Sequence, residues 1–219
     1  SFLCSYRDTL WRYDSLDRKL RGSHLPQRLK KWASDRLSKL NEVISNHWTN
    51  YYDPAVTPTQ AGLLERILKG EGKKAVIVVD ALRYELARDL KLKVKAKIEH
   101  GALLAATPTE TPVGMGALYS SGDIEKTLKD NRVIVRDRKT GRTLDSVTGR
   151  EENLKELVEG VEIIEKDSEL PEVEKLVIKT RDIDSMGHDD LIQFYGGIMT
   201  DLSELADSLL KRGYEVHFT

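Results

Sequence analysis

The chain has 219 residues, with 35 Lys and Arg against 36 Asp and Glu, and a formal net charge of −1. Its one cysteine, Cys4, has no partner within the chain, which excludes a disulfide framework and favours a reducing compartment. No apolar run approaches the roughly 18 residues that span a membrane, and charges interrupt any secretory signal. We therefore expect a cytoplasmic globular protein that does not bind membranes and is large enough to bury a hydrophobic core.

The first part of the chain is basic and has helical periodicity. Residues 1–50 contain ten Lys or Arg and five acidic residues, which gives this segment a charge of +5 and the remainder −6. Apolar residues recur at helical spacing, and Gly22 and Pro26 divide them into two helices. A short helix is expected over 59–69. We predict a helical N-terminal segment over 1–72, whose charge indicates nucleic acid or another protein as partner, or simply a solvated helical surface.

From residue 74 the pattern changes to alternating strands and helices, and we predict an α/β domain over 73–219. Such alternation is typical of a mostly parallel sheet flanked by helices. The predicted strands are 75–79, 161–164, 176–178 and 214–218, with an extended stretch over 94–106. The predicted helices are 81–90, 112–118 and 189–212. Residues 132–136 and 142–144 flank Lys139-Thr-Gly141, which predicts a hairpin insertion.

Three groups of polar residues follow predicted strands, where open α/β sheets bind their ligands. The first is Asp80, directly after the apolar run 75–79 in VIVVDALRYE. A carboxylate at this edge is a hard oxygen ligand for a divalent metal. An aspartate before a helix is equally typical of an N-cap, so the residues alone leave both roles open. Arg83 and Glu85 follow, and either supports the site or pairs with neighbours.

The second group is the threonine cluster of ATPTETPVGMGAL, residues 106–118. Thr107, Thr109 and Thr111 lie before a predicted helix, whose N-terminal N–H groups and dipole favour anions. A hydroxyl beside a metal there is a possible nucleophile. Ordinary turn and capping chemistry is the alternative.

The third group is DIDSMGHDD, residues 182–190, in which Asp184 and His188 are four residues apart. In a helical turn this spacing brings both side chains to one face. A carboxylate and an imidazole together provide half of a zinc site. Asp182 is a competing ligand, and the alternative is that Asp184 caps the helix while His188 is exposed.

Together, the order strand-Asp, threonine nucleophile and Asp-x-x-Gly-His resembles the alkaline phosphatase superfamily. Thr107-Pro-Thr-Glu-Thr-Pro112 is similar to the nucleophile segment of the nucleotide pyrophosphatase/phosphodiesterase branch, in which the second threonine of P-T-x-T attacks phosphorus. Asp184-Ser-Met-Gly-His188 resembles the element that supplies an aspartate and a histidine to one zinc. The PglZ branch, which is associated with prokaryotic defence against phage, is resembled by the segment VVDALRYELARDL together with the later segment PTETPVGMGAL. The resemblance covers about residues 74–219.

The resemblance implies a hydrolase of phosphate mono- or diesters, with a phosphate ester or a nucleotide as substrate, that uses two divalent metal ions, of which zinc is expected. Asp80 and Thr111 would hold one ion, and Asp184 and His188 part of the shell of the other. Thr111 would attack phosphorus, and Arg83 would support the site. The family continues after the last strand with a D-H pair and a later histidine, whereas this sequence ends at Thr219. We therefore expect an incomplete ligand set and weak metal binding in this chain.

Two other functions fit parts of the pattern. A scaffold or binding module of a defence complex would use the same fold without turnover, and metal content would distinguish it from an enzyme. A phosphoacceptor receiver domain would also place an acid after a strand. Receivers usually cluster acids to hold magnesium, and the single acid of VIVVDALR argues against that assignment.

Overall fold

A computed structural model describes residues 2–51, 59–99, 101–188 and 191–219. The chain forms two compact units, each assembled from segments distant in sequence. The first unit comprises residues 1–57, 79–102 and 181–207, and the second comprises 58–78, 103–180 and 208–219. The predicted division into 1–72 and 73–219 stays a prediction about independently folding parts.

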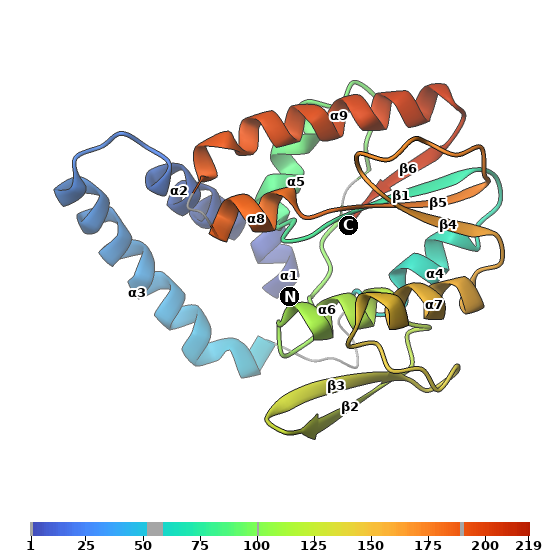
Figure 1. The fold of residues 1–219 in the computed structure, drawn as a ribbon. Coiled ribbons are helices and arrows are strands. Elements are labelled where there is room, and N and C mark those ends of the chain that lie inside the picture. Colours follow the sequence, from blue (N-terminus) through green and yellow to red (C-terminus); the bar gives the residue numbers. More distant parts are fainter. Residues whose placement is uncertain (1, 52–58, 100, 189–190) are drawn as a thin grey trace. The chain divides into compact units, whose positions relative to one another are not determined.

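The second unit contains a four-stranded parallel sheet with the order β4-β5-β1-β6, which confirms the predicted α/β fold (Figure 1). The strands are β1 (Lys74–Val79), β4 (Val161–Glu165), β5 (Lys175–Thr180) and β6 (Glu215–Phe218). Its helices are α4 (Leu63–Leu68), α6 (Thr111–Leu118) and α7 (Val147–Leu157). All four strands match predicted ones, because each is a short apolar run between turn residues. Helix α7 was not predicted.

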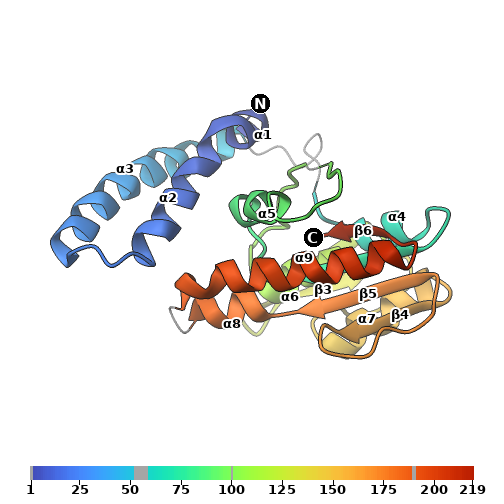
Figure 2. The same cartoon turned by 90° about the horizontal axis from the view of Figure 1, so that it is seen from above.

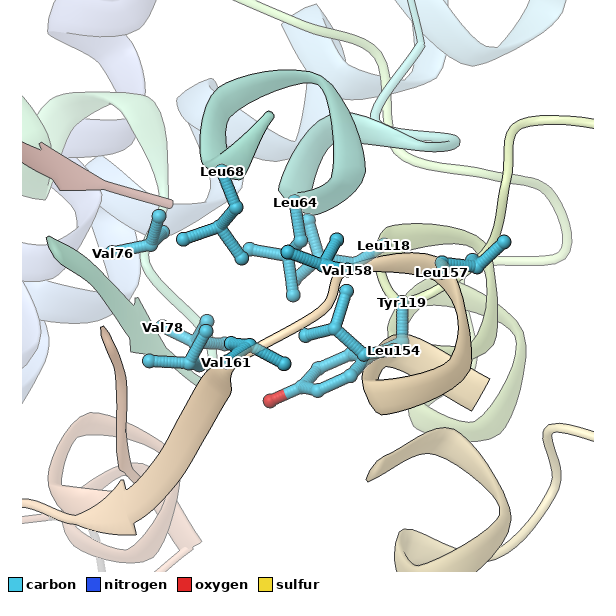
Figure 3. Packing of buried hydrophobic residues seen from close by; sticks show 11 residues of the cluster. Leu64, Leu68, Val76, Val78, Leu118, Tyr119, Leu154, Leu157, Val158 and Val161 are labelled. Carbon is cyan, nitrogen blue, oxygen red and sulfur yellow. The ribbon is translucent and has the colours of Figure 1, made fainter. Parts of the chain in front are cut away.

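One face of this sheet packs against α4 and α7 through a cluster of buried hydrophobic side chains (Figure 3). Val76 and Val78 of β1 meet Leu64 and Leu68 of α4 in this cluster, and α7 contributes Leu154. Burying each such side chain stabilises the fold by roughly 1.5–3 kcal/mol. Because successive side chains of a strand point to opposite faces, Val76 and Val78 fix the face of β1 that packs against α4. This packing also fixes the position of the strand's carboxyl end.

The hairpin insertion exists, but its main pairing differs from the predicted one. Strand β3 (Arg132–Asp137) pairs with β2 (Ile124–Lys129), and the turn between them places Asp130 and Asn131 at φ of 49° and 59°. The predicted pairing with 142–144 reduces to a bridge between Arg136 and Thr143 with flanking hydrogen bonds. Strand β2 was missed because almost all of it is exposed, so it lacks an apolar face. The Asp-Asn turn was the available signal.

Asp137, at the end of β3, is the buried polar centre of the second unit and is fully shielded from solvent. Its carboxylate accepts hydrogen bonds from Ser121 N (2.5 Å), Ser121 Oγ (2.8 Å), Lys139 N (2.9 Å) and Asn153 Nδ2 (3.1 Å). Burial alone would raise the pKa of Asp137, but these donors outweigh it and the pKa lies below its usual value. The carboxylate thus ties the end of α6 and the helix α7 to β3.

We expect Asp137→Asn to lower the free energy of unfolding by roughly 2–4 kcal/mol at pH 7. The amide NH₂ would replace a carboxylate oxygen that accepts hydrogen bonds, and it would then face N–H and O–H groups that are themselves donors. The stability that the lowered pKa provides is present above the unfolded-state pKa of about 3.9 and is lost as pH falls through the folded-state pKa. Urea unfolding at several pH values measures both effects. The difference between wild type and Asp137→Asn should shrink towards acid, and a constant difference would contradict this assignment.

The first unit is helical. Its elements are α1 (Phe2–Ser5), the π-helix η1 (Tyr6–Leu10), α2 (Trp11–Arg21), α3 (Gln27–Tyr51), α5 (Tyr84–Lys91), α8 (Asp182–His188) and the 3-10 turn η2 (Ile192–Phe194). Helix α9 (Tyr195–Lys211) begins in this unit. The predicted division of residues 5–50 into two helices is confirmed, and they form a hairpin that turns at residues 22–26 (Figure 2). No helix among the described residues is long and apolar enough to cross a bilayer.

Two predicted helix boundaries in this unit are wrong. Helix α5 begins at Tyr84 rather than at 81, and α9 begins at Tyr195 rather than at 189. Residues 189 and 190 lie outside the described part of the chain. The stretch 94–106, predicted as extended, forms a bridge at Leu104 and no longer strand in its described residues. Composition alone over-extended each helix, since Ala81 and the apolar residues after 190 fit a helical pattern that the backbone does not adopt.

Candidate active site

Asp80 occupies a tight turn at the end of β1, not the start of a helix. Leu82 N donates to Val79 O at 3.1 Å, and Ala81 between them has a left-handed φ of 64°. Helix α5 starts at Tyr84, four residues after Asp80, with Arg83 at its N-cap position. The N-cap interpretation of Asp80 is therefore wrong. Its carboxylate lies at the carboxyl end of a central parallel strand, and its role as a metal ligand stays a prediction.

The turn at Ala81 holds strain, because a side chain in the left-handed region costs roughly 1–2 kcal/mol. We expect Ala81→Gly to leave the free energy of unfolding unchanged within about 0.5 kcal/mol or to raise it, since relief of strain offsets the greater freedom of the unfolded chain. Ala87→Gly, inside α5, is the matched control and should lower it by about 1 kcal/mol. Equal losses in the two variants, measured by urea unfolding, would contradict the strained turn.

Glu85, in the first turn of α5, is completely buried, Arg18 is nearly so, and the side chain of Arg83 is half exposed. Its Oε1 lies 3.1 Å from Arg83 Nε and 3.9 Å from Arg18 Nε of α2, and Arg18 also pairs with Asp89. Neither carboxylate oxygen receives a hydrogen bond from the described residues. Burial raises the pKa of Glu85, and Arg83 and Arg18 only partly oppose this shift. Arg83 thus pairs with its neighbour, one of the two roles predicted for it.

We expect Glu85→Gln to be as stable as wild type at pH 7 or more stable, because the amide keeps the shape without a desolvated charge. A raised folded-state pKa means that the carboxyl group contributes stability below its unfolded-state pKa and loses it as pH rises through the folded-state pKa. The advantage of Glu85→Gln should therefore grow with pH and vanish towards pH 4. Thermal melts across this range provide the measurement, with Glu85→Ala as the cavity-forming control. A Gln variant as unstable as the Ala variant would contradict the assignment.

The threonine segment leads into α6. Thr111 is the first residue of that helix, and its side chain is exposed. The helix predicted over 112–118 is confirmed with one additional residue. The first turn offers fewer N–H donors than the sequence led us to expect. Val113 N and Gly114 N both donate to Glu110 O, at 3.0 and 2.8 Å, and Pro112 has no N–H. The hydroxyl of Thr111, rather than a ring of backbone N–H groups, is therefore the main polar feature that this terminus presents.

Helix α8 follows β5 almost directly and contains Asp182, Asp184 and His188. No helix was predicted over 182–188, but the spacing argument assumed a helical turn, and the backbone of α8 does place residues 184 and 188 one turn apart. The side chain of His188 lies outside the described part. Asp184 is the third residue of the helix and so does not occupy the N-cap position. Gly187 leaves room for Tyr195, because a Cβ there would lie 2.9 Å from the tyrosine hydroxyl and force it to shift. The buried Tyr195 donates that hydroxyl to Ile183 O at 3.2 Å.

The four predicted ligands divide between the two units. Asp80, Asp184 and His188 belong to the first unit and Thr111 to the second, and their convergence stays a prediction. Among the described residues, no three His, Cys, Asp or Glu side chains form a group that could hold a metal ion. The donor types suit zinc, but a closed zinc site takes about four ligands and these four residues would serve two ions. The four predicted residues therefore have suitable donor atoms for zinc, but they are too few to complete two metal sites.

The sequence matches the family described as the BREX system PglZ alkaline phosphatase-like domain over residues 63–194, more than half of the chain. The chain belongs to the PglZ family. No curated protein and no solved structure gives a significant match. The family match establishes a relationship to the alkaline phosphatase superfamily, as the order of Asp80, Thr111 and the Asp184–His188 element indicated.

Two features lie outside what the motifs indicated. Arg18 precedes the PglZ match, yet it pairs with the buried Glu85 of α5, which lies within the match. No periodicity distinguishes this arginine from the other basic residues of the N-terminal segment.

In α3, Trp32 is 59% exposed, and the guanidinium of Arg36 lies 4.7 Å from the centre of its ring. That the basic segment binds nucleic acid or another protein stays a prediction.

Proposed function

We propose that this PglZ domain belongs to a metal-dependent phosphate-ester hydrolase that acts in phage defence, with Thr111 as its nucleophile. The observation that carries the proposal is the position of Asp80 in a strained turn at the end of β1, within a chain of alkaline phosphatase-like family. A helix cap would need no such turn, and strained backbone is concentrated at functional sites. The resemblance to PglZ proteins supports the defence role.

The proposed reaction has two displacements at phosphorus. The Oγ1 of Thr111 forms a bond to phosphorus as the bond to the leaving oxygen breaks, and the hydroxyl proton departs to the leaving alcohol or to solvent. Water then attacks the phosphothreonine and regenerates the hydroxyl, with phosphate, or a phosphate monoester from a diester, as product. The exposure of Thr111 at the start of α6 suits this role, because a nucleophilic hydroxyl must be accessible to the phosphate ester that it attacks.

Asp80, Thr111, Asp184 and His188 are the residues that would hold the two metal ions, with further ligands needed to complete the shells. When bound, such ions stabilise charge on the attacking and leaving oxygens. The contribution of this chain is to fix its own donors. The Ala81 turn fixes Asp80, and the hydrogen bond from Tyr195 to Ile183 O fixes the helix that carries Asp184.

We expect Thr111→Ala, in the full-length protein, to lower the rate of hydrolysis of a chromogenic phosphodiester by at least about 10³-fold, because it removes the nucleophile. Thr111 is exposed, so the free energy of unfolding should change by no more than about 1 kcal/mol. Thr109→Ala, an exposed threonine of the same segment, is the matched control and should retain activity. Initial rates and thermal melts of all three proteins give the comparison.

Thr107→Ala tests whether the alignment of the threonines is displaced. A fully active Thr111→Ala enzyme would remove the central residue of the proposal, and loss of activity in Thr109→Ala alone would transfer the role to Thr109. A full-length wild-type protein with no bound metal and no hydrolysis of any phosphate ester would favour the scaffold function instead.

A further inference from the structure

The β2–β3 hairpin packs against the helix that begins with Thr111, and one of its lysines reaches the threonine segment (Figure 1). Lys126 Nζ donates to the backbone carbonyl of Thr107 at 2.6 Å. Both residues lie in the second unit. The contact joins a strand that was not predicted to the stretch immediately before the proposed nucleophile.

The structure holds this stretch at both ends. At its start, Gln60 N donates to Leu104 O at 3.2 Å, and Thr59 forms a parallel bridge with the same leucine. In α6, Gln60 Nε2 donates to Gly114 O at 2.6 Å. Residues 105–110, in between, have no regular secondary structure. Lys126 therefore supplies a charged donor to the middle of an irregular connection, four residues before Thr111.

The hairpin that carries Lys126 is itself fixed on α6. The Cα of Gly116 faces Val135 of β3 and Leu144 so closely that an added Cβ would lie 3.3 Å from each. All three residues are buried, Val135 and Leu144 completely. The hairpin that carries Lys126 is therefore held against the helix that begins with Thr111. The hydrogen bond of Lys126 fixes the segment before α6 relative to that helix.

We propose that Lys126 is a positioning residue for Thr111, which it orients by fixing the Thr107 carbonyl from the β2–β3 hairpin. The proposal rests on Thr111 being the nucleophile of the proposed function. A reacting atom displaced by about 1 Å can lose on the order of 10² in rate, so one charged hydrogen bond to the preceding segment is enough to matter. Lys126 acts on the backbone, and its role does not require contact with substrate.

The first test does not depend on activity. Hydrogen exchange of a peptide covering residues 103–111 should be faster in Lys126→Met than in wild type, by about 10-fold or more, because the segment loses its central anchor. Lys129→Met is the matched control, since Lys129 is an exposed lysine of the same strand, and it should leave exchange unchanged. Lys126→Arg, which can still donate to the carbonyl, should restore most of the protection. Equal exchange in the two methionine variants overturns the proposal.

The second test separates positioning from substrate binding. In the full-length enzyme, Lys126→Met should lower kcat by about 10–100-fold with little change in KM or melting temperature, and Lys126→Arg should recover most of kcat. A raised KM with unchanged kcat would make Lys126 a substrate-binding cation and overturn the positioning role. If the full-length wild type hydrolyses no phosphate ester, or Thr111→Ala stays active, the proposed function itself fails. An active enzyme with normal kcat in Lys126→Met refutes only the role of Lys126.

Discussion

Strand β1 carries five consecutive apolar residues, Ala75 to Val79, and none of them is more than 3% exposed. A strand without polar side chains and without access to water must pair its backbone on both edges. Here β5 lies on one side and β6 on the other, with Lys74 N bonded to Glu174 O and Thr219 N to Ile77 O. The central position of β1 decides where the chain emerges, and Asp80 is the first residue after it.

This constraint explains which parts of the fold could be predicted from the sequence. Buried parallel strands are short uniform apolar runs, and helix α6 begins after a threonine- and proline-rich turn, so these elements could be predicted. Helix α8 was not predicted as a helix, because only Arg181 separates it from β5. The exposed strand β2 and the helix α7 have no uniform apolar run. Strand β2 is specified by its pairing with β3, and α7 has a local signal that was overlooked, since Ser146 caps it by accepting from Gly149 N. The start of α5 was misplaced because the left-handed backbone at Ala81 is imposed by the turn, and alanine itself favours a helix.

The candidate site divides in the same way. Spacing and order were sufficient to select Asp80, Thr111 and the Asp184–His188 element. The same information could not show that Glu85 is buried between two arginines, because Arg18 is 67 positions away in the sequence. Nor could it identify Lys126, which differs from the other exposed lysines only in the carbonyl that it contacts. Long-range polar contacts of this kind depend on packing, which a local pattern does not encode.

The position of β6 has a consequence for how the family is delimited. The PglZ match ends at residue 194, whereas β6 runs from Glu215 to Phe218 and supplies one neighbour of β1. A protein trimmed to the matched residues would leave the most apolar strand of the sheet with an open hydrogen-bonding edge. Such edges recruit strands from other molecules, and aggregation follows. The segment that is recognisable by sequence is therefore smaller than the segment that keeps its central strand covered.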